Sequence, residues 1–207
     1  MWILPSRSRP HNLLRLIDAW VRTGASTPVE LCIDLDDPHG LQYDALPLLP
    51  LWSVKIETRH PLCTLSSIYN NAYRRYPNEP WFGFISDDVV PITNGWDSIL
   101  IEAAGRDGMA VPAGGHDPNG APHFVLGGDL VRSVGWLSLP GLDRLYIDTV
   151  WQRIAEARGV LRRVPEVVLE HRHFSNKKAR IDATYLKHRK TQDKLIYDNW
   201  RQNGHFS

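Results

Sequence analysis

The stretch WFGFISDDVVPITNGW, residues 81–96, indicates the fold of this chain more directly than any other. Residues 82–85 have the aromatic and branched apolar composition of a buried strand. Two adjacent carboxylates, Asp87 and Asp88, follow after a single serine. Charges at the end of a buried strand are costly unless something positive faces them. The stretch therefore predicts a cation, a helix start or solvent next to Asp87 and Asp88.

Strands and helices alternate on the amino-terminal side of this stretch. The predicted strands lie in WILP (2–5), VELCIDLDD (29–37) and SVKIET (53–58), and the predicted helices in HNLLRLIDAWVRTG (11–24) and LSSIYNNAYRRYP (65–77). In the first helix the apolar residues share one face, and Gly24 stands where a helix stop is expected. The alternation predicts an α/β domain with a mostly parallel sheet, in which ligands bind outside the carboxyl ends of the strands.

The carboxyl-terminal side is less regular. Residues 105–128 are dense in glycine, proline and histidine, which predicts loops around two strands, at 109–112 and 123–126. Long loops in a compact domain often carry function. TVWQRIAEARG (149–159) has the periodicity of an amphipathic helix.

Two histidines stand late in the chain. In VPEVVLEHRHF (164–174), the period-two alternation of a strand puts His171 and His173 on the same side. The segment after them is polar and basic with interspersed aromatic residues. We therefore expect a domain over residues 1–174 and an extension over 175–207 that packs as a helix or wraps around the domain.

Composition limits the class of protein. A chain of 207 residues with a net charge of +1 favours one main domain and argues against a global attraction to nucleic acid or acidic membrane. Cys32 and Cys63 lack metal-type spacing and predict reduced core residues, hence a cytoplasmic protein. The apolar run at the amino terminus is too short for a signal peptide, and no run of about 18 apolar residues predicts a transmembrane segment.

Several segments together resemble a known family. PSRSRPHNLLRLIDAW (5–20), VELCIDLDDP (29–38) and FISDDVVP (84–91) are similar to the Pro-containing first loop, the acidic second strand end and the Asp-x-Asp region of family-2-type glycosyltransferases with the GT-A fold. The resemblance extends through residues 127–159 to the late histidines. It implies a Rossmann-like, GT-A-like domain that moves a sugar from a UDP- or GDP-sugar to an acceptor hydroxyl with inversion. The Gln-x-x-Arg-Trp pattern of processive synthases is absent, so the enzyme is expected to be non-processive.

The resemblance also implies a metal site. The diphosphate of a nucleotide sugar leaves only if its growing negative charge is neutralised, which a divalent ion held by carboxylates can do. Mg²⁺ and Mn²⁺ prefer oxygen ligands, and Mn²⁺ also accepts imidazole. The implied ligands are Asp88 and either His171 or His173. Asp87 supports Asp88 or contacts the ribose.

The remaining implied site residues belong to the donor and the acceptor. Asp36 would bind the base or ribose, in a pocket that Pro5, Ser6 and Arg7 also line. Asp148 would act as the base that deprotonates the acceptor hydroxyl. The acceptor itself stays open between a glycan, a lipid, a protein and a modified nucleobase.

Each assignment has a structural alternative. Asp87 and Asp88 could form a turn before Pro91, Asp148 could cap the helix that follows it, and the histidines could lie on a partly exposed sheet face. Two other functions also remain open. A sugar nucleotidyltransferase would need a Gly-rich phosphate loop, and the loop PSRSRP has no glycine. A catalytically silent module would bind a nucleotide sugar or nucleic acid without turnover.

Overall fold

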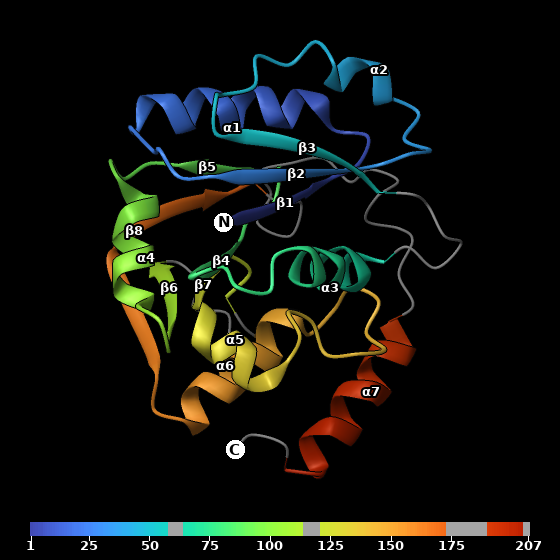
Figure 1. The fold of residues 1–207 in the computed structure, drawn as a ribbon, viewed down its shortest axis with the longest axis vertical. Coiled ribbons are helices and arrows are strands. Elements are labelled where there is room, and N and C mark those ends of the chain that lie inside the picture. Colours follow the sequence, from blue (N-terminus) through green and yellow to red (C-terminus); the bar gives the residue numbers. More distant parts are fainter. Residues whose placement is uncertain (58–63, 114–120, 173–189, 205–207) are drawn as a thin grey trace.

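The computed structural model describes residues 1–57, 64–113, 121–172 and 190–204, which fold around an eight-stranded sheet (Figure 1). The order of the strands across the sheet is β3-β2-β1-β4-β7-β6-β8-β5. The strands are β1 (Trp2–Ser6), β2 (Val29–Asp34), β3 (Trp52–Glu57), β4 (Trp81–Phe84), β5 (Val89–Pro91), β6 (Met109–Ala113), β7 (Phe124–Gly127) and β8 (Leu161–His171).

The amino-terminal half of the sheet is parallel. β3, β2, β1 and β4 are neighbours that all run in one direction, so their carboxyl ends lie along one edge. β7 then pairs antiparallel with both β4 and β6, and β5 pairs antiparallel with β8. The α/β prediction is confirmed, but the sheet is mixed: among the described strands, four of the seven pairings are parallel.

Helices cover both faces of the sheet (Figure 1). They are α1 (Pro10–Arg22), α2 (Gly40–Tyr43), α3 (Leu65–Arg75), α4 (Trp96–Ala104), α5 (Gly128–Val134), α6 (Ile147–Ala157) and α7 (Lys190–Gln202). The predicted stop of the first helix is confirmed, because Gly24 follows α1 with a φ of +68°, a left-handed conformation that favours glycine. No helix among the described residues combines the length and the apolar character that crossing a bilayer requires.

The core on the α1 and α4 side is built from tryptophans. The ring of Trp2 on β1 lies 6.3 Å from Trp20, 5.7 Å from Trp81 and 4.9 Å from Trp96, centroid to centroid, and Trp20 also contacts Trp52 at 5.2 Å. Strand β4 leaves room for these rings opposite Trp2 by placing a glycine, residue 83, in the paired position. These large apolar side chains bury the inner face of α1 and fix it over the parallel strands.

The core on the other face joins α3, α5, α6 and α7. Phe82 and Phe84 of β4 and Trp151 of α6 belong to it, as do Tyr197 and Trp200 of α7. Within the described part of the predicted extension, Tyr197 and Trp200 thus pack on the domain from a helix. The predicted division at residue 174 falls outside the described residues and stays a prediction.

Four short elements, α2, α4, α5 and β5, have no counterpart among the sequence predictions. α4 is apolar over most of its circumference, so no single apolar face marks it in the sequence. α5 begins at Gly128, in a Gly-Gly-Asp segment that is typical of a turn, and β5 has three residues. Such elements form because the surrounding sheet buries them, not because their own residues favour them.

Candidate active site at the carboxyl end of strand β4

Asp87 and Asp88 lie between β4 and β5 and are almost fully buried, with 5% and 6% exposed. A positive group faces them, as the cost of burying charge requires. The guanidinium of Arg9, itself buried in the loop between β1 and α1, places Nη1 3.4 Å from Asp87 Oδ1 and 3.8 Å from Asp88 Oδ2. The two carboxylates are therefore part of a charge network and do not simply form a turn.

Asp87 is tied to the first loop of the chain. The Ser6 hydroxyl donates to Asp87 Oδ2 at 2.8 Å, and the Asn12 side-chain amide donates to Oδ1 at 3.5 Å. Burial, together with the charge of Asp88, raises the pKa of Asp87 to about 6, although Arg9, Ser6 and Asn12 act in the opposite direction. This carboxylate is thus held in a fixed orientation at the end of β1.

Asp88 contacts an imidazole. His171 Nε2 lies 3.2 Å from Asp88 Oδ1, and the Ser86 hydroxyl donates to the same oxygen. Burial by itself would raise the pKa of Asp88, but the hydrogen bonds and nearby imidazoles lower it below the usual range of a carboxyl. The pairing of Val89 with His171 across β5 and β8 brings the two groups together. His173, the other predicted candidate, lies outside the described residues.

His123 is a site residue that sequence reasoning missed. It directly precedes β7, is 4% exposed, and its ring centroid lies 4.8 Å from that of His171. Neither ring nitrogen of His123 has a hydrogen-bond partner among the described residues. Burial, reinforced by His171, lowers the pKa of His123 to about 3, so this imidazole is neutral. A single histidine in a loop carries no sequence pattern, and only the density of histidines in residues 105–128 pointed to this region.

Asp88 and His171 lie close enough to share one divalent ion, and His123 lies next to His171, although the ligand atoms of all three do not gather within 4.8 Å of one another as they do in the described group of Glu30, Cys32 and Glu57. Two ligand atoms on adjacent corners of an octahedron with bonds of about 2.1 Å lie roughly 3 Å apart, close to the 3.2 Å between Asp88 and His171. A neutral, buried imidazole without a hydrogen-bond partner is a ready metal ligand. One carboxylate and two imidazoles suit Mn²⁺ better than Mg²⁺.

The predicted donor residues surround the loop between β1 and α1. Arg7 forms ion pairs with Asp34 and with Asp36, whose Oδ1 lies 2.9 Å from Arg7 Nη1. Its hydrogen bond to Asp36 raises the pKa of Arg7, although burial opposes this. The structure therefore brings together two predicted donor residues, Arg7 and Asp36. Pro5 and Ser6 end β1 beside them.

Asp37, which follows β2, holds this loop in place. Its carboxylate accepts the backbone N–H groups of Ser8 at 2.6 Å and His39 at 2.8 Å. Ser8 needs such support because its φ of 58° is unusual for a residue with a side chain.

Asp148 lies in the first turn of α6. α6 begins at Ile147 with Tyr146 as its N-cap, so Asp148 is the second residue of the helix and not the capping residue. Its carboxylate accepts the backbone N–H of Thr149 at 2.8 Å and stays partly exposed. Burial raises the pKa of the Tyr69 hydroxyl, and the negative charge of Asp148 raises it further as a smaller cause.

A row of packed rings runs from Tyr69 of α3 to β4 and β7. Tyr69 packs on Phe84 at 4.3 Å between centroids, and Phe84 stacks on Phe124 at 4.3 Å. Phe84 is the last residue of β4 before the segment that carries Asp88, and Phe124 follows His123. These three rings thus join Tyr69 of α3 to the chain segments that carry Asp88 and His123.

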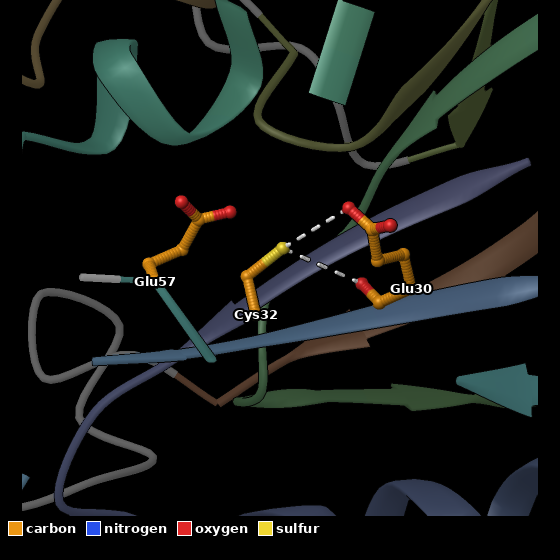
Figure 2. A group of neighbouring side chains, drawn as sticks. All are labelled: Glu30, Cys32 and Glu57. Atoms are coloured by element: carbon orange, nitrogen blue, oxygen red, sulfur yellow. Dashed lines mark hydrogen bonds between the residues drawn. The ribbon is translucent and has the colours of Figure 1, made fainter. Parts of the chain in front are cut away.

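A second acidic group lies under α3 (Figure 2). Glu30 and Cys32 of β2 and Glu57 of β3 are buried, and their ligand atoms lie within 4.8 Å of one another, close enough for one metal ion. Arg75 of α3, however, already forms ion pairs with Glu30 and with Glu57, the latter at 3.0 Å although the angle is poor for a hydrogen bond. Burial raises the pKa of the Cys32 thiol, so it is not a thiolate. We interpret this group as an ion network that ties α3 to the sheet.

Comparisons with known proteins agree on the fold. No protein-family model and no curated protein matches the sequence. Among solved structures, a mycobacterial protein has a TM-score of 0.62 at 11% identity, over 96% of this chain and 73% of its own. GalNAc-T7 with UDP, GalNAc and Mn²⁺ gives 0.58 at 12% identity, over 82% of this chain and 42% of its own. A cytidylyltransferase from Leptospira borgpetersenii serovar Hardjo-bovis gives 0.53 at 10% identity, over 99% and 94%.

Identities this low show the fold alone. The GT-A-like fold predicted from the sequence is confirmed, and the same fold also occurs in the cytidylyltransferase. Membership of the family-2-type glycosyltransferases stays a prediction.

Proposed function

We propose that this protein is a metal-dependent glycosyltransferase that transfers a sugar from a nucleoside diphosphate to an acceptor hydroxyl. One observation carries the proposal. At the carboxyl end of β4, Asp88 lies 3.2 Å from His171, and His123 stands beside them with two ring nitrogens that have no partner among the described residues. These side chains would supply ligands to a divalent ion at the sheet edge where nucleotides bind in such folds.

The donor would lie between this ligand set and the loop after β1. Asp36 would contact the base or ribose, in a pocket that its ion-pair partner Arg7 also lines. Asp87, with Ser6, would orient the ribose or the carboxylate of Asp88. Arg9 is close to both carboxylates, where it offsets their repulsion and leaves Asp88 ionised for the metal.

The metal would be held by Asp88, His171 and His123. When bound, a divalent ion supplies a Lewis acid that neutralises the negative charge on the leaving diphosphate. GalNAc-T7, which shares the fold, was solved with UDP and Mn²⁺. This supports a nucleoside diphosphate and Mn²⁺ as the pair to test first.

The acceptor would bind near the start of α6. Asp148 is partly exposed there, and an ionised carboxylate can accept the proton of a hydroxyl that becomes acidic as the new sugar bond forms. An inverting transfer would require this base and the leaving diphosphate to lie on opposite faces of the sugar.

A sugar nucleotidyltransferase is the second candidate, favoured by the likeness to the cytidylyltransferase over nearly the full length of both chains. Such an enzyme needs free cationic groups in the first loop to bind a nucleoside triphosphate. Here Arg7 pairs with Asp34 and Asp36, and Arg9 pairs with Asp87 and Asp88. The products separate the two candidates: a glycosyltransferase releases a nucleoside diphosphate, and a nucleotidyltransferase releases pyrophosphate.

Calorimetric titration of UDP and GDP, with and without Mn²⁺, tests the metal site. We expect the nucleotide to bind only with Mn²⁺. Asp88→Asn removes the charge of one metal ligand and His123→Ala removes another ligand, so each should weaken that binding by more than about tenfold. Asp129→Asn is the matched control, since Asp129 pairs with Arg106 and Arg132 on the surface. Unchanged Mn²⁺-dependent binding in Asp88→Asn would remove Asp88 from the site and contradict the proposal.

A further inference from the structure

Asp193 of the carboxyl-terminal helix α7 binds the loop that leads into α6. Its carboxylate accepts three successive backbone N–H groups, those of Asp143 at 2.7 Å, Arg144 at 3.0 Å and Leu145 at 2.8 Å. Asp193 is 1% exposed, and Asp143 is 50 residues away in the sequence. Consecutive N–H groups that converge in this way form a nest for an anion, and hydrogen bonds to an ionised acceptor are the stronger kind.

The next residue of the loop is held by the same helix. Tyr146 has a φ of 68°, a conformation that side chains rarely adopt and that persists only where neighbouring structure enforces it. Its ring stacks on that of Tyr197, one turn further along α7, with 4.7 Å between centroids and 7° between planes. The Tyr197 hydroxyl in turn accepts a hydrogen bond from Arg153 Nε of α6 at 3.2 Å.

These contacts fix the start of α6. Its N-cap, Tyr146, makes no capping hydrogen bond with its side chain, so the helix start lacks the usual side-chain cap that would fix its direction. α7 holds it instead, through Asp193 at residues 143–145 and Tyr197 at Tyr146. Asp148 is the second residue of the helix so placed.

We propose that Asp193 is a positioning residue: it clamps residues 143–145 and thereby places Asp148 against the acceptor, so that sugar transfer requires α7 to be docked. The proposal rests on the proposed function for the role of Asp148. It assigns the carboxyl-terminal helix to the acceptor half of the reaction, and it leaves the binding of metal and donor to the loop after β1 and the end of β4.

Asp193→Asn tests the clamp, because the amide has nearly the same shape but lacks the charge and one of the two acceptor oxygens. We expect backbone amide exchange in residues 143–145 to accelerate on the order of ten- to a hundredfold, as the loss of charged hydrogen bonds implies. Binding of Mn²⁺ with UDP or GDP should stay within about twofold of wild type, whereas release of nucleoside diphosphate from a nucleotide sugar should fall at least about tenfold.

Asp198→Asn is the matched control, since Asp198 lies on the same helix and pairs only with Lys194 among the contacts that the structure gives it. It should leave exchange and turnover unchanged. Unchanged exchange at residues 143–145 in Asp193→Asn would overturn the clamp, and accelerated exchange with wild-type turnover would overturn the positioning role. If wild type itself neither binds nor turns over nucleotide with Mn²⁺, the proposed function is wrong, and the exchange result still decides whether Asp193 holds the loop.

Discussion

Asp148 stands apart from the other candidate carboxylates at the level of the single residue. Asp87 and Asp88 are buried among hydrogen-bond donors, whereas Asp148 is partly exposed and accepts the N–H of Thr149. A proton acceptor must reach a substrate hydroxyl, so exposure favours Asp148 for this step. The same position, in the first turn of a helix, also favours a carboxylate for purely structural reasons.

Asp148→Asn separates these two roles. The loss of a negative charge from the first turn should cost only about 0.3–1 kcal/mol, so the melting temperature should stay near that of wild type. Binding of Mn²⁺ and nucleotide should also be normal, but transfer should fall by roughly 10² or more because the base is gone. The measurements are a melting curve, a titration and an assay of nucleoside diphosphate release.

Near-normal transfer by Asp148→Asn would leave Asp148 with a structural role at the start of α6. Asp143 would then be the next carboxylate to test, because Asp129 is already paired with Arg106 and Arg132.

Residue chemistry explains which site residues the sequence could predict. Asp87 and Asp88 are conspicuous because two charges interrupt an apolar run, and their burial beside Arg9 agrees with that signal. His123 gives no such signal, since a lone imidazole among loop residues looks the same whether it faces solvent or a metal. Its assignment needs the orphaned ring nitrogens that only the folded chain reveals.

At the level of the element, α3 is joined to the parallel strands by charge as well as by apolar packing. Arg75 near the end of α3 bridges Glu30 on β2 and Glu57 on β3, both of which are buried. Removal of one partner from a buried ion network leaves uncompensated charge, which costs far more than the network contributes when it is intact.

Arg75→Ala should therefore lower the free energy of unfolding by roughly 3–5 kcal/mol, measured by urea denaturation. Arg74→Ala is the control on the same turn, where the exposed side chain pairs only with Asn71 in the described structure, and it should change stability by less than about 0.5 kcal/mol. Adding Glu30→Gln to Arg75→Ala should restore part of the loss. If Zn²⁺ or Mn²⁺ instead restored the stability of Arg75→Ala, the group would be a cation site and not only an ion network.

The elements with clear periodicity were predicted well, and the others were not. α1, α3 and α6 each present one apolar face to the sheet, which the spacing of apolar residues encodes directly. α4 and β5 are defined by what packs around them, and a local pattern cannot encode that. A local pattern cannot encode the register between β5 and β8 either. This register pairs Val89 with His171 and so places His171 next to Asp88.

At the level of the whole molecule, the parallel half and the mixed half of the sheet hold different parts of the proposed site. The parallel strands β1, β2 and β4 end at the donor side, and this half could be predicted because strand–helix alternation implies parallel neighbours. The mixed half brings together histidines and a terminal helix that are far apart in the sequence. Their meeting depends on strand order, and the sequence alone does not determine strand order.

The tryptophans packed around β1 have a spectroscopic consequence. Five of the eight tryptophans, namely Trp2, Trp20, Trp52, Trp81 and Trp96, form one rigid cluster on the face opposite α7. Near-ultraviolet circular dichroism reports aromatic rings held in fixed asymmetric packing, so this cluster should dominate the spectrum. Undocking of α7 should leave that signal nearly intact, whereas global unfolding should abolish it. The near-ultraviolet signal of this cluster therefore distinguishes undocking of α7 from global unfolding.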